Sequence, residues 1–208
     1  MKNTDKHKVA TKLIQAAQKY DEYLNNLHFL IVYQKDNQHQ LVQIGFRDLH
    51  FKHLTGVESR LSAQRFYAKC INNKLSINDF EISKDGKSEQ KLIVLPYLHE
   101  LLYHNCMIGV FINSGIRIQA DYFVGDTKAV LSVGFRQGIR VDIPVTLYKE
   151  NVKKLSKPVY KVLAIFKKRY NQIEYKECTY LSKGQIINSL KNPENIKISE
   201  KLKRCKSE

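Results

Sequence analysis

The chain has 208 residues, 43% of them hydrophobic, which is enough to bury one sizeable core. Its 35 Lys and Arg residues outnumber 20 Asp and Glu residues, and the formal charge of +15 favours a polyanionic partner. No apolar run approaches the roughly 20 residues that span a bilayer, and the charged first residues do not resemble a signal peptide. We therefore expect a cytoplasmic protein with no membrane partner.

The first half of the chain predicts helices and one hairpin. Apolar residues at helical spacing predict a helix over residues 4–26, and two β-rich runs around the turn "KDNQ" predict a hairpin over residues 27–46. A third element, a helix, follows Ser62 as its N-cap. Residues 88–104 predict another helix, in which Pro96 either kinks the helix or lies in the first turn of a shorter one.

The second half predicts a sheet. The runs "NCMIGVFIN", "IRIQADYFV", "AVLSVGFR", "RVDIPVTLY" and "PVYKVLAIF" alternate with turn residues, a pattern typical of an antiparallel meander. The fold class is therefore α+β. We expect a short helix in "LSKGQIINSL" and a frayed basic tail over residues 191–208. A division into residues 1–45, 46–176 and 177–208, within one compact domain, fits these changes of pattern.

Metal and cofactor chemistry find no support in the sequence. Cys70, Cys106, Cys178 and Cys205 form no C-x-x-C pair, so we expect reduced thiols and no zinc ribbon. The histidines of "HELLYH", residues 99–104, are five positions apart, whereas a zincin helix needs four, and we expect them to be structural. "GDTK", residues 125–128, lacks the spacing of a phosphate loop and predicts a hairpin turn. We expect no metal and no cofactor.

A basic segment predicts nucleic-acid binding. Residues 149–176 contain nine Lys and Arg residues, interleaved with tyrosines and one phenylalanine. Lysines neutralise phosphates and aromatic rings stack on bases, a combination typical of proteins that bind single-stranded RNA or DNA. The alternative is a solvated lysine face over a tyrosine-rich core. The candidate binding residues are Lys153, Lys154, Lys157, Lys161, Lys167, Lys168 and Arg169.

The stretch "FRDLHFKHLTGV", residues 46–57, concentrates groups that move protons or hold phosphate. Cleavage of RNA without a metal needs a base for the 2′-hydroxyl, an acid for the leaving oxygen, and cations or hydroxyls for the phosphorane. His, Lys, Arg and Thr supply these functions near neutral pH. A plainer interpretation is a junction between a strand and a helix, in which the histidines pack or cap.

This stretch, with the following "RFYAKCINNKLSINDFEIS" and "KLIVLPYLHELL", resembles the phage barnase/EndoU/colicin/RelE-like nucleases, particularly their fourth phage subgroup. The shared features are an aromatic before a His-Leu-Thr-Gly element, a helix ending near a Lys-Leu-Ser turn, and a lysine opening the next helix. The resemblance covers roughly residues 46–146. The amino-terminal helix, the hairpin and the basic carboxy-terminal segment lie outside it.

The resemblance implies amino-terminal helices packed on an antiparallel sheet, a role in phages or prophages, and metal-independent RNA cleavage. By position it assigns His53, Thr55, Lys91 and Thr146 to the site. We expect His53 to act as general base or acid, Lys91 and Arg47 to clamp phosphate, and Thr55 and Thr146 to donate hydroxyls. His50 is expected to be structural.

Two alternatives remain open, because fold does not establish catalysis. The chain could be a non-catalytic binding protein of a mobile element, such as an anti-defence factor or adaptor. It could also be a toxin that acts on tRNA and is blocked by an antitoxin partner.

Overall fold

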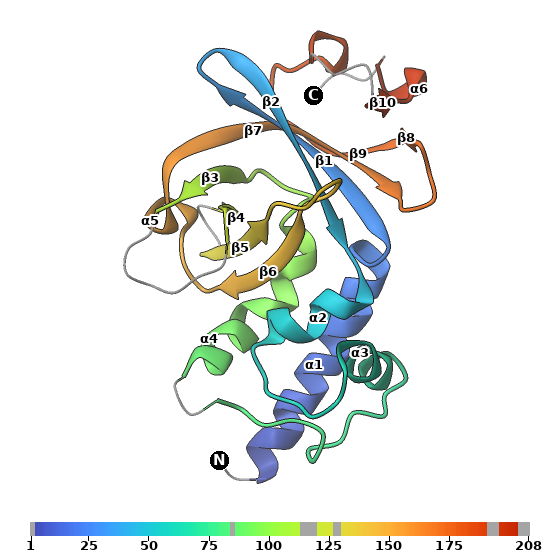
Figure 1. The fold of residues 1–208 in the computed structure, drawn as a ribbon, viewed down its shortest axis with the longest axis vertical. Coiled ribbons are helices and arrows are strands. Elements are labelled where there is room, and N and C mark those ends of the chain that lie inside the picture. The colour runs from blue at the N-terminus through green and yellow to red at the C-terminus, as the bar shows by residue number, and fades with distance from the viewer. Residues whose placement is uncertain (1–2, 84–85, 113–119, 127–129, 191–195, 204–208) are drawn as a thin grey trace.

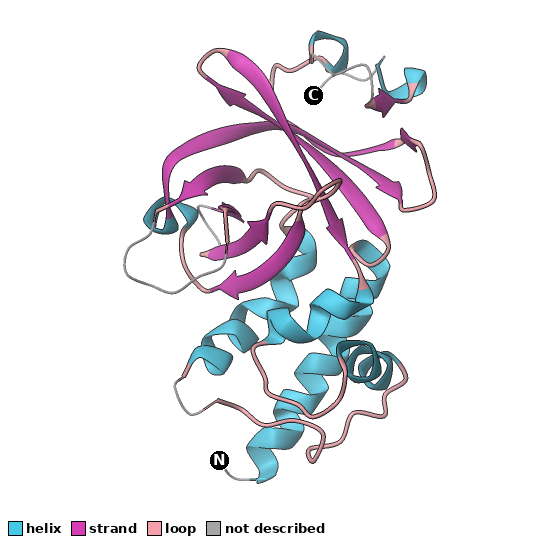
Figure 2. Cartoon of the chain, viewed as in Figure 1, coloured by secondary structure: helices cyan, strands magenta, loops and turns pink. Residues whose placement is uncertain are grey.

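The computed structural model describes residues 3–83, 86–112, 120–126, 130–190 and 196–203. Most of the helical residues gather on one side of a curled sheet, as Figures 1 and 2 show. The α-helices are α1 (Asn3–Tyr23), α2 (Asp48–Thr55), α3 (Ala63–Ile71), α4 (Lys87–Val94), α5 (Val152–Leu155) and α6 (Glu200–Lys203). Two short 3₁₀ helices are η1 (Leu95–Glu100) and η2 (Ile187–Ser189).

The main sheet is antiparallel and has the order β2-β1-β7-β3-β4-β5-β6, with β9 added beside β7. Its strands are β1 (Leu27–Lys35), β2 (Gln38–Phe46), β3 (Met107–Phe111), β4 (Tyr122–Asp126), β5 (Leu131–Arg136), β6 (Ile143–Tyr148), β7 (Ser156–Arg169) and β9 (Glu177–Leu181). A small parallel pair is formed by β8 (Glu174–Tyr175) and β10 (Lys197–Ile198). A bridge between Ile44 and Asp142 brings the outer edge of β2 back toward β6, so the sheet curls.

The long strand β7 joins the two halves of the sheet. Its first half pairs with β3 and its second half with β1, while β9 pairs beside it from Ala164 to Lys167. The fifth apolar run therefore does not continue the meander of β3 to β6 but returns to its opposite edge. The run from Val162 to Phe166 is fully buried, as expected for a central strand with both faces covered.

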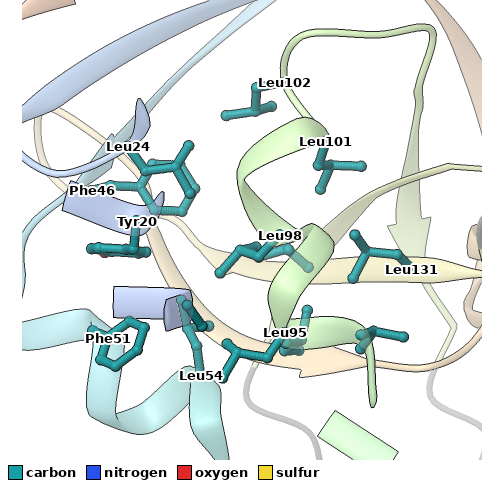
Figure 3. Packing of buried hydrophobic residues seen from close by; sticks show 14 of the residues in the cluster. Tyr20, Leu24, Phe46, Phe51, Leu54, Leu95, Leu98, Leu101, Leu102 and Leu131 are labelled. Carbon is teal, nitrogen blue, oxygen red and sulfur yellow. The ribbon is translucent and has the colours of Figure 1, made fainter. Parts of the chain in front are cut away.

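The principal core lies between the helices and the sheet. Tyr20 of α1 and Phe51 of α2 pack edge to face, with ring centroids 5.2 Å apart, and Figure 3 shows both beside Phe46. Leucines of η1 and the segment after it complete this layer opposite Leu131 of β5. This layer holds α2 against β6 and so fixes the position of the His-rich stretch.

The opposite face of the sheet is covered by two smaller clusters. The carboxy-terminal segment places Ile187, Leu190 and Ile198 against the β1 and β7 half. Val152 and Leu155 of α5 pack with Ala120 and Phe123 behind the β3 to β6 half. The described part of the expected frayed tail thus includes β10 and α6, and residues 191–195 and 204–208 lie outside the described residues.

Most of the local predictions are confirmed. The hairpin spans Leu27–Phe46 in register, and both residues of its turn, Asp36 and Asn37, have positive φ. The Ser62 hydroxyl accepts a hydrogen bond from Arg65 N at 3.3 Å and caps α3. Pro96 lies in the first turn of η1, which decides between the two alternatives for it.

One local prediction changes in the structure, and another lies partly outside the described residues. The segment "LSKGQIINSL" forms the end of β9 and only a three-residue 3₁₀ turn, η2. Within "GDTK", Gly125 and Asp126 belong to β4, while residues 127 and 128 lie outside the described part of the chain. Within the ranges given above, no helix is long and apolar enough to cross a membrane.

Candidate active site around His53

Most of the stretch of residues 46–57 forms helix α2. Some polar side chains of this stretch make hydrogen bonds within the fold, and others are exposed to solvent. Lys52 is structural: its ammonium donates to the carbonyl oxygens of Ser59 at 2.7 Å and Leu61 at 2.6 Å. These two bonds tie the loop after Gly56 back to the helix. Arg47 and His53 remain exposed.

His50 caps the start of α2, in agreement with the structural role predicted for it. It is buried, with 6% of its surface exposed, and its Nδ1 accepts a hydrogen bond from Arg47 N at 3.2 Å. Burial, with the nearby charges of Arg47 and His53, lowers the pKa of His50 to about 4, although Asp48 opposes the shift. His50 is therefore neutral at pH 7 and able to accept that bond.

Thr55 closes the last turn of α2. Its side chain is fully buried, and its hydroxyl donates to the Lys52 carbonyl at 2.6 Å and accepts from Val57 N at 3.2 Å. The helix ends at Gly56, whose φ of 72° is left-handed and favours glycine. The hydroxyl of Thr55 is thus engaged in the turn and is not presented to a substrate.

Lys91 reaches this site from α4, the element in which the sequence placed it. Its side chain crosses Gly56 so closely that an added Cβ there would meet Lys91 Cδ at 2.6 Å. The Ser88 hydroxyl, one turn earlier on α4, donates to the Gly56 carbonyl at 2.6 Å and joins the two helices. Lys91 is half-buried and lies near enough to His53 to shift its pKa.

His53 is the exposed titratable group at the centre of this arrangement. Partial burial lowers its pKa from the usual 6.5, and the positive charges of Lys91 and Arg136 lower it further. A hydrogen bond to the backbone of Val145 on β6 acts in the opposite direction. His53 is thus held between α2, α4 and the β5–β6 end of the sheet, with its neutral form favoured.

Arg47 and Thr146 are placed differently from His53. Arg47 is the extended residue just before α2, six positions before His53, and its guanidinium stands 5.6 Å from the Tyr170 ring centre. Thr146 is 8% exposed and faces Ala120 and Phe123 behind the sheet, where both would crowd a Cβ on the opposing Gly134. The structure brings together His53 and Lys91, with Arg47 at the far end of α2, but not Thr146.

A pocket of about 220 Å³ adjoins Lys91. Its lining includes three lysines, one carboxylate and one aromatic ring: Lys87, Lys91, Lys149, Glu58 and Tyr148. Lys87, Arg136 and Glu58 are not among the site residues predicted from the sequence. They are recognised as site residues only because the fold brings them close to Lys91 or His53. For Arg136, the basic turn "RQGIR" was the one signal in the sequence.

The proposed nucleic-acid-binding residues are spread over the molecule. Lys153 and Lys154 lie on α5, and Lys157 and Lys161 are exposed along the first half of β7. Lys167 reaches the helical side, where it meets Glu177 at 3.0 Å and Tyr103, whereas the ammonium of Lys168 stands 4.7 Å from the Tyr175 ring centre. Arg169 is exposed at the end of β7. These seven residues do not form one patch around His53.

Of the histidines of "HELLYH", His99 is placed as a structural group, whereas His104 is exposed. His99 makes a 2.9 Å contact with the Pro96 carbonyl oxygen through Nδ1 and packs against Tyr23. In the described ranges, no group of three or more His, Cys, Asp or Glu side chains is arranged to hold a metal ion. Cys70 and Cys106 are buried free thiols, and burial raises the pKa of each to about 12.

Comparison with known proteins identifies the family of the chain. No curated protein and no solved structure gives a significant match. The sequence model of the phage-Barnase-EndoU-ColicinE5/D-RelE like nuclease4 family matches residues 12–184. This match is wider than the resemblance over residues 46–146, because it includes most of α1, the hairpin and the strands up to β9. The chain belongs to this family of phage-associated nuclease-like proteins.

Proposed function

We propose that the protein is an endoribonuclease that cleaves RNA without a metal ion, with His53 as the proton-transfer group. The observation that supports this most directly is the position of His53. It is an exposed imidazole with a lowered pKa, flanked by Lys91 and Arg136, in a chain of a nuclease family. A neutral imidazole can accept a proton near pH 7, and the neighbouring cations suit a phosphate.

In the proposed reaction, His53 takes the proton of a ribose 2′-hydroxyl. The 2′-oxygen then forms a bond to phosphorus, and the bond from phosphorus to the 5′-oxygen breaks. The leaving oxygen takes up a proton from a water molecule, and protonated His53 returns its proton to the hydroxide that this leaves. The products are a 2′,3′-cyclic phosphate and a 5′-hydroxyl. Lys91 and Arg136 would stabilise the negative charge that grows on the non-bridging oxygens in the transition state.

The other basic residues would act on neighbouring phosphates. Arg47 lies at the opposite end of α2 from His53, beside Tyr170, so we assign it to an adjacent phosphate. Lys87 and Lys149 would hold the strand where it enters the pocket beside Lys91. The exposed lysines of α5 and β7, Lys153, Lys154, Lys157 and Lys161, would add longer-range attraction for RNA. Thr55 and Thr146 receive structural roles in this proposal.

The test is incubation of the purified protein with total RNA in excess EDTA. Wild type should cleave the RNA and leave cyclic phosphate ends. The variant His53→Ala should cleave on the order of 10² to 10⁴ more slowly, the usual contribution of a general acid–base group. His50→Gln is the matched control from the same helix and should cleave at nearly the wild-type rate.

Two results would contradict the proposal. Cleavage that EDTA abolishes and added Mg²⁺ restores would require a metal-dependent reaction. RNA binding by the folded wild type without any cleavage would instead favour a non-catalytic binding protein. Thermal unfolding of each variant, followed by circular dichroism, separates loss of chemistry from loss of the fold.

A further inference from the structure

The connection between β5 and β6, residues 136–142, presents a fully exposed isoleucine beside the proposed active site. Ile139 has a relative exposure of 105%, the largest among the exposed apolar side chains of the described residues. Exposed Arg136 and Arg140 flank it in sequence. Single exposed apolar residues are common on protein surfaces, so the surroundings of Ile139 determine whether this one is informative.

The loop is held rigidly by two aspartates. Asp121 accepts a hydrogen bond from Gln137 N at 2.7 Å, and Asp142 accepts from Gly138 N at 3.0 Å and from the Tyr122 hydroxyl at 2.7 Å. A Cβ added to Gly138 would collide with the carbonyl oxygen of Val141, so the turn is closed tightly.

The backbone of the loop is also fixed to β2. Asp142 N donates to the Gln43 carbonyl at 2.8 Å, and Gly45 N donates to the Asp142 carbonyl at 2.9 Å. In Figure 1 the connection between β5 and β6 can be followed to its place beside β2. Because the loop is already anchored, it loses little further conformational entropy when a partner binds Ile139.

The loop also has a fixed position relative to the candidate catalytic group. Arg136, at its start, is one of the charges that lower the pKa of His53, and Val145, just beyond its end, shares a hydrogen bond with His53. Val141 packs close to Gly45, two residues before Arg47. The support from which Ile139 projects therefore lies near His53, through Arg136 and Val145, and near the end of β2, through Val141.

We propose that Ile139 is a wedge that inserts between two adjacent bases of the RNA strand, while Arg140 contacts a flanking phosphate and Arg136 holds the phosphate of the opened step beside His53. Apolar side chains held beside arginines unstack base steps in this way in other nucleic-acid complexes, and unstacked bases are the form in which proteins read single-stranded RNA. Opening one step would turn the ribose on its 5′ side, which carries the attacking 2′-hydroxyl, toward His53. The inference rests on the proposed nuclease function and adds its substrate class: a flexible, single-stranded base step.

The experiment uses RNA that cannot react. A short single strand in which every ribose carries a 2′-O-methyl group, with 2-aminopurine at one position, reports unstacking by a rise in fluorescence. Wild type should bind it with a several-fold rise, and Ile139→Ala should lose most of that rise and about tenfold in affinity. Ile139→Leu should keep both. Ile186→Ala, which removes an exposed apolar side chain at a turn of the carboxy-terminal segment, is the matched control and should behave as wild type.

The possible results separate this proposal from the nuclease proposal. If Ile139→Ala binds with an unchanged fluorescence rise, the wedge is overturned even if the protein cleaves RNA, and Ile139 would then be better explained as a contact for a protein partner. Failure of wild type to bind the oligonucleotide would also overturn it. A normal rise that depends on Ile139, in a protein that cleaves no RNA in EDTA, would support the wedge and contradict the nuclease.

Discussion

The Lys91 side chain lies across Gly56, with its Cδ 2.6 Å from the point where a Cβ of residue 56 would stand. This contact joins the end of α2 to α4 and sets the distance between Lys91 and His53. It also explains why a left-handed residue without a side chain follows Thr55.

Gly56→Ala should therefore impair the site as well as the fold. We expect a loss of about 1 kcal/mol or more in the free energy of unfolding from the φ of 72°, together with displacement of Lys91. Gly184→Ala is the matched control, since Gly184 has φ 81° and no heavy atom within 4 Å of its added Cβ. Urea unfolding should show similar losses for both variants, and only Gly56→Ala should slow RNA cleavage. Equal cleavage rates in the two variants would contradict this account of Gly56.

Lys91→Gln should raise the pKa of His53. The positive charge of Lys91 disfavours the imidazolium, so its removal should move the pKa back toward the usual 6.5. The acid limb of the pH–rate profile should move to higher pH with it, since a base must be neutral to accept a proton. The His53 pKa can be measured by NMR titration of the imidazole protons. Lys149→Gln, which neutralises another lysine of the same pocket, should leave that pKa unchanged.

His50 should make folding stability depend on pH. Its pKa is about 4 in the folded protein and about 6.5 when unfolded. Protonation thus favours unfolding, and the stability present above pH 6.5 should be lost as pH falls toward 4. His50→Gln keeps a side-chain acceptor for Arg47 N and should weaken this pH dependence. His28, whose pKa burial also lowers to about 4, and His53, whose pKa is lowered as well, remain in both proteins and contribute the residual slope.

His50→Ala removes the acceptor altogether. We expect it to cost about 1 kcal/mol or more at pH 7, because it leaves Arg47 N without its partner. Urea denaturation of wild type and both His50 variants at pH 7 and pH 4.5 measures these differences. A pH dependence identical in wild type and His50→Gln would show that other groups govern it.

The salt dependence of RNA binding should distinguish lysines near the pocket from those paired elsewhere. Each phosphate contact on a single strand contributes about 0.7 to the slope of log affinity against log salt. Lys87→Gln or Lys149→Gln should lower the slope by about that amount. Lys167→Gln should leave the slope nearly unchanged while reducing stability, because Lys167 pairs with Glu177 and Tyr103. A larger slope change for Lys167→Gln than for Lys87→Gln would locate RNA on β7.

The sequence by itself determined the elements and the fold class. Helical spacing, the Asp36-Asn37 turn and the Ser62 cap are local properties, and each appears in the structure close to its predicted position. The place of the fifth strand was not determined, because β7 pairs with residues far away in sequence. A buried run such as residues 162–166 shows that both faces are covered, but not which strands lie beside it.

For the site, the sequence identified a segment rich in suitable groups, and only the tertiary structure decided what each group does. Residue types at 47–57 could not show that Lys52 and Thr55 bond to backbone carbonyls while His53 stays exposed. Arg136 and Ile139 belong to the proposed site only because the β5–β6 connection bonds to β2, which leads into α2. Helix faces and hydrogen-bond partners are set by the packing of distant segments, and that packing is what local sequence leaves undetermined.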